Sequence, residues 1–299
     1  MEGRLWGREK LNQLLIVPDI ADIEKVMAEG GVDKQREYGL KSAFAAVAES
    51  LPDRSLLHFL QYPYDCHNLK TLEKCRLKGV DSAELLIDLG SVSAKTLLTV
   101  SQKELLTLLP AHLAQAVIEA GESYARTRDP REIDFIFDRA LYADMQAAAA
   151  PYPFAAEFVK MKADLVNLMI CLRLLRMQGG ELGRATLLRA AIPVGSFDEG
   201  FLLACYEGGE EVFCKQTSKT PYAAIFERGQ TLADTERKAD DCLMAWVRRA
   251  RQVTFGAEVP IAYIFAVQQQ SLNLRILLAG REAGLDAETI RARMRESYV

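Results

Sequence analysis

Two short patterns each occur three times, in the same order, along this 299-residue chain. The first pattern is a glycine followed seven residues later by two leucines, and it begins at Gly7, Gly90 and Gly195. The second pattern is an Asn-Leu pair followed 11 or 12 residues later by a glycine. Either pattern alone can arise by chance in a Leu-rich chain, but their shared order favours an internal repeat. The predicted repeat units are residues 1–89, 90–194 and 195–299.

A polar residue stands three positions before each asparagine of the second pattern. Residues three apart share one face of a helix, so the two polar side chains project together from an otherwise apolar helix. A buried carboxylate or amide needs hydrogen-bond partners, which could be backbone groups or a cation at the end of a neighbouring helix. We expect anchors that fix helix register, with a catalytic carboxylate as the alternative. The pairs are Asp65 with Asn68, Asp164 with Asn167, and Gln270 with Asn273, and the glycines are Gly79, Gly179 and Gly284.

Helical periodicity dominates the rest of the chain. Asp164–Met177 is apolar nearly all round, which is typical of a buried helix, and Glu236–Val253 has the spacing of an amphipathic one. Ala43–Leu51 and Ala111–Ala120 are rich in Ala and Leu. Alternating runs of strand length are nearly absent. The sequence therefore predicts an all-α fold.

Charge and hydropathy exclude several partners. With 37 basic against 41 acidic residues the net charge is −4, which argues against a nucleic-acid binder. The longest stretch without a charged residue, Val259–Leu274, contains Pro260 and three glutamines and is not a membrane span. Charged residues near the N-terminus argue against a secretory signal. We expect a cytoplasmic protein.

Known catalytic and metal-binding patterns are missing from the sequence. It has no phosphate-binding Gly-x-x-x-x-Gly-Lys-[Ser/Thr] loop and no Gly-x-Ser-x-Gly elbow. Only the adjacent Cys66 and His67 approach a metal-ligand spacing, and His58 and His112 are expected at or near the surface. We predict no catalytic residue, no cofactor and no metal.

Two charged clusters near the C-terminal third have simple interpretations. Asp240-Asp241 lacks the third aspartate of an isoprenoid-synthase metal motif, because Met244 stands there, and we expect it on a solvated helix face. The basic cluster of Arg248, Arg249 and Arg251 is an exposed face or a partner-binding patch at a helix end.

Several stretches resemble the C subunits of V/A-type (vacuolar-type) rotary ATPases, the counterparts of the d subunit of the eukaryotic V-ATPase. The most telling are Phe255–Tyr263, with its Glu-x-Pro core, and the following Asn273-Leu-Arg275. Asp65 to Asn68, Asp164 to Asn167 and Ile192–Gly195 also match, in order, over essentially the whole chain. The chain departs from the family at Thr254, where the family has proline, and at Gln268 and Gln270, where it has acidic residues.

The resemblance implies a non-catalytic, funnel-shaped all-α socket of three units about a pseudo-threefold axis. Such a socket sits on the cytoplasmic face of the membrane rotor ring without spanning the membrane. Its partners are the central-shaft subunits and the ring's cytoplasmic loops, and it passes torque between them. The resemblance also adds Arg275 to the set of structural anchors.

The hollow of such a socket should be lined where small and polar residues meet at the unit junctions. We therefore expect Gly90-Ser91 and Gly195-Ser196 to face the shaft, the alternative being simple surface linkers. The competing functions are a generic all-α scaffold with other partners and, less favoured by the missing motifs, an all-α enzyme.

Overall fold

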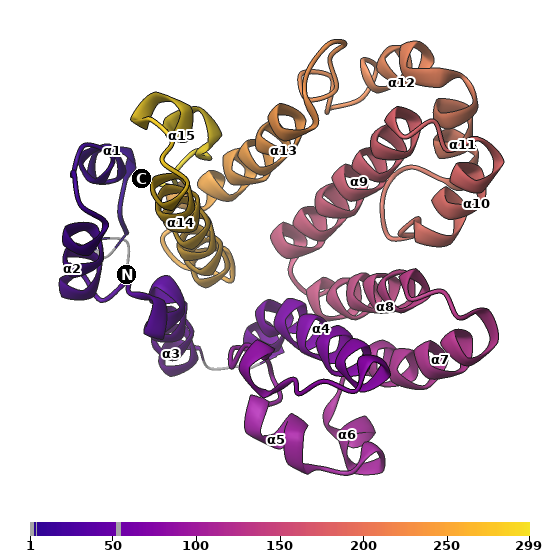
Figure 1. The fold of residues 1–299 in the computed structure, drawn as a ribbon, viewed down its shortest axis with the longest axis horizontal. Coiled ribbons are helices and arrows are strands. Elements are labelled where there is room, and N and C mark those ends of the chain that lie inside the picture. The colour runs from indigo at the N-terminus through magenta and orange to yellow at the C-terminus, as the bar shows by residue number, and fades with distance from the viewer. Residues whose placement is uncertain (1–2, 4, 52–54) are drawn as a thin grey trace. The chain divides into compact units, whose positions relative to one another are not determined.

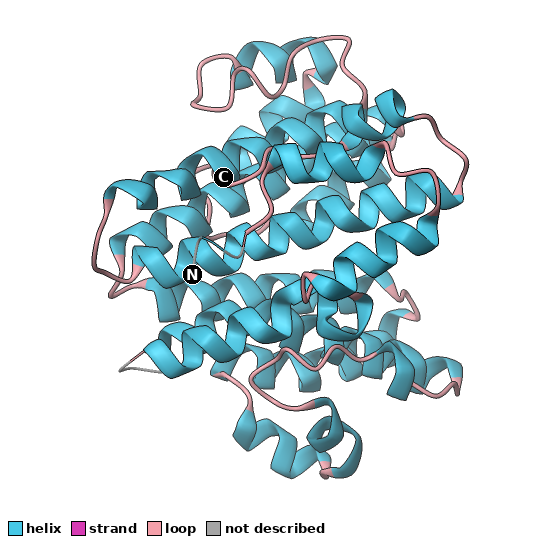
Figure 2. Ribbon diagram, turned by 90° about the vertical axis from the view of Figure 1, so that its left-hand side faces the viewer, coloured by secondary structure: helices cyan, strands magenta, loops and turns pink. Residues whose placement is uncertain are grey.

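A computed structural model describes residues 3, 5–51 and 55–299 of the chain, without the side chains of Gln35 and Arg36. Every regular element in these residues is a helix, and none of them forms a strand (Figure 2). The predicted all-α fold is confirmed.

The helices form two compact units. Unit 1 combines the two ends of the chain, residues 1–52 and 229–299, and unit 2 is the continuous stretch 53–228. These units follow from spatial contacts, whereas the three predicted repeats follow from a recurring sequence pattern. The threefold division stays a prediction.

Unit 2 is built around three long helices. The α7–α8 hairpin packs side by side, α4 lies along α8, and α9 follows α8 and carries α10, α11 and α12 on its surface (Figure 1). Leu165, Leu168 and Leu172 of α9 are all buried, as the apolar stretch in this helix predicts. The elements are α4 (Ser55–Lys78), η3 (Ala83–Leu85), α5 (Ala94–Thr99), α6 (Gln102–Leu108), α7 (Ala111–Thr127), α8 (Arg131–Ala149), α9 (Pro153–Arg176), α10 (Gly180–Ala190), α11 (Glu199–Glu207) and α12 (Gly209–Thr217).

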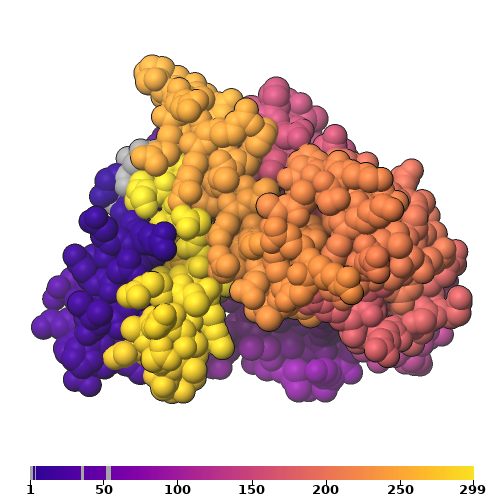
Figure 3. Space-filling view, turned by 90° about the horizontal axis from the view of Figure 1, so that it is seen from above, coloured from indigo at the N-terminus to yellow at the C-terminus, as the bar shows by residue number. Residues whose placement is uncertain are grey.

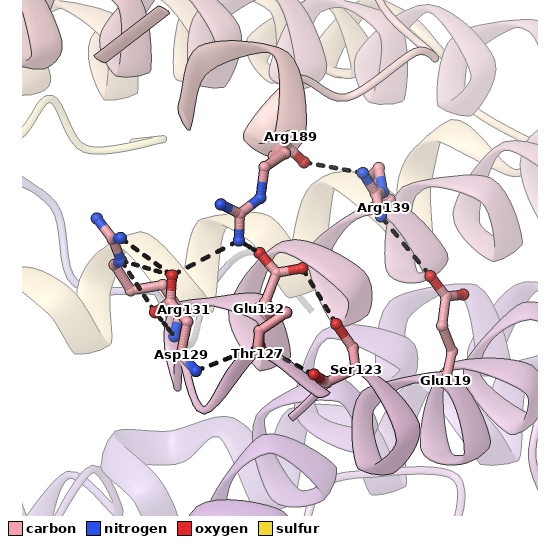
Figure 4. A network of polar contacts seen from close by, with 8 residues as sticks. All are labelled: Glu119, Ser123, Thr127, Asp129, Arg131, Glu132, Arg139 and Arg189. Carbon is pink, nitrogen blue, oxygen red and sulfur yellow. Dashed lines mark hydrogen bonds and ion pairs between the residues drawn. The ribbon is translucent and has the colours of Figure 1, made fainter. Parts of the chain in front are cut away.

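A polar network ties α10 to the α7–α8 hairpin (Figure 4). Arg189 of α10 forms ion pairs with Asp129 and Glu132, and Ser123 donates a hydrogen bond to Glu132. Arg139 of α8 donates to the carbonyl oxygen of Arg189 at 2.8 Å. The three charged side chains are half-buried at the surface. Ion pairs near the surface contribute roughly 0–1 kcal/mol each, so this network orients α10 more than it stabilises the unit.

Unit 1 surrounds one long helix, α14, with shorter ones from both ends of the chain. Its core joins leucines of α1 to Leu274 and Leu277 of α14 and to Ile290 of α15. The elements are α1 (Arg8–Leu15), α2 (Ile20–Glu29), η2 (Lys34–Gly39), α3 (Leu40–Ser50), α13 (Leu232–Val247), η4 (Arg248–Gln252), α14 (Glu258–Glu282) and α15 (Ala287–Arg293).

One predicted helix differs from the observed structure. The amphipathic stretch expected over Glu236–Val253 is α-helical only to Val247 and continues as the 3₁₀ turn η4 to Gln252. A 3₁₀ turn is a common way for a helix to end, and it redirects the chain toward the start of α14.

Candidate functional site: a polar anchor on three long helices

The three longest helices, α4, α9 and α14, each carry one predicted polar pair near their middle. All six side chains are buried, with no more than 5% of any residue exposed. Three of the chain's four asparagines are used in this way. A buried polar side chain is costly unless it is hydrogen-bonded, so the partners decide what these residues do.

In unit 2 the asparagines pair with a backbone segment that follows each helix. Asn68 donates from Nδ2 to the carbonyl oxygen of Ile87 and accepts from the Ile87 N–H at Oδ1, both at 2.8 Å. Asn167 makes the same two bonds to Ile192, also at 2.8 Å. A side-chain amide can both donate and accept, so it satisfies both backbone groups of one residue.

Asn273 in unit 1 repeats this arrangement. Its Nδ2 donates to the carbonyl oxygen of Arg295 at 3.0 Å, and its Oδ1 accepts from the Arg295 N–H at 2.8 Å. The three asparagines therefore have the same hydrogen-bond geometry, each toward a segment downstream of its own helix.

The first carboxylate of the set, Asp65, accepts hydrogen bonds from the turn that contains Gly90 and Ser91. Its Oδ2 accepts from the N–H of Ser91 at 3.1 Å and from its hydroxyl at 2.7 Å, and its Oδ1 accepts from the Val92 N–H at 3.2 Å. A Cβ at position 90 would lie 2.2 Å from Asp65 Oδ1, which explains why this position is occupied by glycine. Burial raises the pKa of Asp65, and the bonds from Ser91 and Val92 oppose that rise.

Asp164 accepts hydrogen bonds from the second such turn, which contains Gly195 and Ser196. Ser196 donates its N–H to Oδ1 at 2.5 Å and its hydroxyl to Oδ2 at 2.8 Å, and the Tyr222 hydroxyl donates to Oδ2 at 2.9 Å. A Cβ at Gly195 would lie 2.5 Å from Oδ1. The junction residues thus have a role inside the protein that the sequence did not reveal.

The third anchor is completed by a remote part of the chain. Gln270 accepts at Oε1 from the N–H of Trp6 at 2.7 Å, across 264 residues of sequence. The next residue, Gly7, lies against the backbone of Val299, where a Cβ would be 3.1 Å from the carbonyl oxygen. Figure 3 shows the indigo N-terminal and yellow C-terminal segments of unit 1 side by side.

Each anchor helix also ends in the same way. Gly79 and Gly284 adopt positive φ, donate to the carbonyl three residues back, and are followed by a residue that donates five residues back. In α9 the same two bonds are made by Gln178 and Gly179, with Gln178 at φ +52°. The residue equivalent to the two glycines is therefore Gln178 rather than the predicted Gly179, and each cap stands 11 residues after its asparagine.

Arg275 lies apart from these hydrogen bonds. Its side chain is 48% exposed, pairs with Glu37 at 3.8 Å, and stacks over the ring of Tyr38 at 5.0 Å. The structure thus brings Arg275 to η2 and not to Gln270 or Asn273.

The two charged clusters after α12 compare differently with the sequence interpretation. In the basic cluster Arg249 and Arg251 are exposed, as expected, and Arg248 is half-buried. The prediction of a solvated face for Asp240-Asp241 is wrong for Asp241, whose side chain is 19% exposed and accepts from the Glu296 N–H at 2.7 Å. Asp240 is 38% exposed and accepts from Arg295 Nε at 2.9 Å. Burial raises the pKa of Asp241. Both residues secure the segment that Asn273 also holds. No local sequence pattern predicts these contacts, because they join residues 55 positions apart in the sequence.

The described residues contain no group of His, Cys, Asp and Glu side chains that could hold a metal ion. His58 and His112 are exposed, as expected. Among the residues with assigned structure, no helix has the length and apolar character needed to cross a membrane.

Comparisons with known proteins point to one family. The model of the ATP synthase (C/AC39) subunit family matches residues 1–293. The C subunit of the V-type sodium ATPase of Enterococcus hirae is 25% identical over 279 residues, covering 90% of this chain and 84% of that protein. The C subunit of the A-type ATP synthase of Halorubrum lacusprofundi is 24% identical over 342 residues, covering 98% and 93%. The chain therefore belongs to the ATP synthase (C/AC39) subunit family, whose relatives are the C subunits of V- and A-type ATPases.

Proposed function

We propose that this chain is a non-catalytic rotor subunit in the central stalk of a V/A-type rotary ATPase. It acts as a socket that links the central shaft to the membrane rotor ring and transmits torque during ATP-driven ion transport or ATP synthesis. It lies peripherally on the cytoplasmic face of the membrane. Family membership supports the kind of complex, and the repeated anchor supports the mechanical role.

The observation that carries the mechanical role is the common anchor on α4, α9 and α14. A part that transmits torque must resist deformation, and close-packed interiors deform little. Each of the three helices is fixed at its middle by hydrogen bonds from a fully buried asparagine to another backbone segment. Such bonds hold helix register, because sliding by one residue would leave several buried polar groups unpaired.

The same anchors support the threefold organisation. One polar pair, one closing segment and one helix cap recur for α4, α9 and α14, in agreement with repeats over 1–89, 90–194 and 195–299. We further infer that the junctions face the shaft. Ser91 and Ser196 are exposed residues whose backbone is held by a buried carboxylate, which would present a firm, small-residue surface to a partner.

Reconstitution tests this function. Membranes from cells that lack this chain should hydrolyse ATP without moving ions, and addition of the purified chain should restore ion transport. The purified chain alone should show no saturable ATP binding by calorimetry, because its sequence has no phosphate-binding loop. A chain that neither binds these membranes nor restores transport would be a scaffold for other partners, and the proposed function would be wrong.

A further inference from the structure

The loop before α14 exposes an aromatic side chain. Phe255 is 89% exposed, and no other large apolar side chain in the described residues is as exposed. Covering a Phe side chain is worth roughly 1.5–3 kcal/mol, so an uncovered one at the tip of a loop forgoes that stabilisation.

The shape of the loop keeps this ring outward. Gly256 has φ +146°, a backbone conformation that side chains rarely adopt, and a Cβ there would lie 2.2 Å from Glu258 Oε2. The glycine therefore permits a tight turn directly after Phe255, at the start of α14.

Three arginines come shortly before Phe255 in the sequence. The segment Ala245–Ala257 contains these three arginines and no acidic residue, and Glu258 follows it directly. One of them, Arg248, is used inside unit 1, where it pairs with Glu296 at 3.1 Å and donates to the carbonyl oxygen of Ser297.

The other two arginines are exposed but held in place. The Arg249 guanidinium lies over the Trp246 ring, 4.1 Å from its centroid. Arg251 lies over the Tyr298 ring at 5.9 Å and donates to the Tyr298 carbonyl oxygen at 3.5 Å. Fixed side chains lose less entropy on binding, so these two cations are preorganised for a partner.

We propose that Arg249, Arg251 and Phe255, together the Arg/Phe knob, dock into an apolar pocket rimmed by carboxylates on another protein subunit of the ATPase. Aromatic rings and arginines are enriched among the residues that dominate binding energy at interfaces. The arginines match a carboxylate rim by charge. A single ring is a poor membrane anchor, since interfacial binding to lipid scales with the apolar area buried. This inference rests on the proposed function.

Binding to depleted membranes tests the knob. The probe is a membrane preparation from cells that lack this chain but retain the rest of the ATPase, and binding of purified chain is measured by sedimentation. We expect Phe255→Ala to weaken binding about 30-fold, and Arg249→Gln with Arg251→Gln to weaken it and reduce its salt dependence. Ile16→Ala is the matched control, because Ile16 is 74% exposed in the same unit and residues 9–23 around it contain no arginine, and it should leave binding unchanged.

The outcomes separate the two proposals. If the wild-type chain does not bind the depleted membranes, the proposed function fails. If it binds and Phe255→Ala binds equally well, the knob is not a docking element. Protein-free vesicles of the extracted lipids should not bind the chain. Phe255-dependent binding to those vesicles would assign the knob to lipid and overturn the protein pocket.

Discussion

In unit 2 each anchor is closed by chain that follows its helix, whereas in unit 1 the anchor on α14 is closed from both ends of the sequence. Ser91 follows Asp65 by 26 residues and Ser196 follows Asp164 by 32, but Trp6 precedes Gln270 by 264. The geometry of the asparagine is nevertheless the same in both units. An anchor therefore requires a backbone segment within hydrogen-bond distance of its polar side chains, and the separation of that segment from the helix in the sequence does not matter.

The polar residue three positions before each asparagine reflects this difference. The two carboxylates of unit 2 each receive three hydrogen bonds, including two from one serine. Gln270 receives a hydrogen bond from Trp6. A buried carboxylate with so few donors would be costly, and a neutral amide avoids that cost.

The largest effect should come from removing an anchor asparagine. Asn68→Leu, Asn167→Leu and Asn273→Leu each delete two hydrogen bonds and leave a backbone N–H and C=O without that partner. These groups are buried at Ile192 and partly buried at Ile87 and Arg295. We expect each to lower the free energy of unfolding of its unit by about 3 kcal/mol, measured by urea denaturation. Asn12→Leu, which changes the remaining, partly exposed asparagine, is the control and should cost little. A negligible loss of stability in Asn273→Leu alone would show that the anchor of unit 1 is not equivalent to the two anchors of unit 2.

Replacing the glycines that lie against the anchors with alanine should lower the stability of unit 2 more than that of unit 1. Gly90→Ala and Gly195→Ala place a Cβ 2.2 and 2.5 Å from a carboxylate oxygen, so something must shift. Overpacking of this kind costs about 2 kcal/mol. At Gly7 a Cβ would lie 3.1 Å from its closest neighbour, the carbonyl oxygen of Val299. Gly7→Ala should therefore cost less than about 1 kcal/mol, half the cost at the other two glycines. Thermal unfolding of the three variants gives the ranking, and equal costs would contradict it.

Gln270→Glu should give unit 1 the pH dependence of a buried carboxylate. Burial raises the pKa of Asp65 above its unfolded value, so the folded protein holds that proton more tightly and this contribution to stability is lost as pH rises through the folded pKa. A glutamate at position 270 should behave likewise, and the variant should lose about 2 kcal/mol relative to wild type between pH 4 and pH 8. The less buried Gln268→Glu is the control. A constant difference from wild type across this range would show that the site tolerates the charge.

The smallest effect concerns the cap of α9. Gln178 has positive φ, which costs a side-chain-bearing residue about 1 kcal/mol, so Gln178→Gly should stabilise unit 2 by up to roughly 0.5 kcal/mol after the entropy of glycine is counted. Gly79→Ala and Gly284→Ala should destabilise their units by about 1 kcal/mol. Calorimetric melting temperatures test the opposite signs, and a destabilising Gln178→Gly would remove Gln178 from the set of caps.

Local sequence patterns predicted the all-α class, the positions of four helices and the polar pairs, but not the 3₁₀ end of the stretch Glu236–Val253. The apolar run within α9 and the three-residue spacing of Asp164 and Asn167 depend on helix geometry alone. The partners of these residues depend on tertiary contacts. Nothing near Gln270 indicates Trp6, and nothing near Asp241 indicates Glu296. Gln178 was missed because Gly179 directly follows it and glycine is the usual residue at a helix cap.

Hydrogen exchange at three backbone amides tests most directly whether the two units hold their long helices in the same way. The N–H groups of Ile87, Ile192 and Arg295 each donate to an anchor asparagine, at 2.8 Å in every case. Protection reports the free energy of the opening that breaks such a bond. We expect all three amides to exchange slowly, and each to exchange fast only in the Asn→Leu variant of its own anchor. An Arg295 amide that exchanges at the rate of an unfolded chain, with Ile87 and Ile192 protected, would contradict a common anchor.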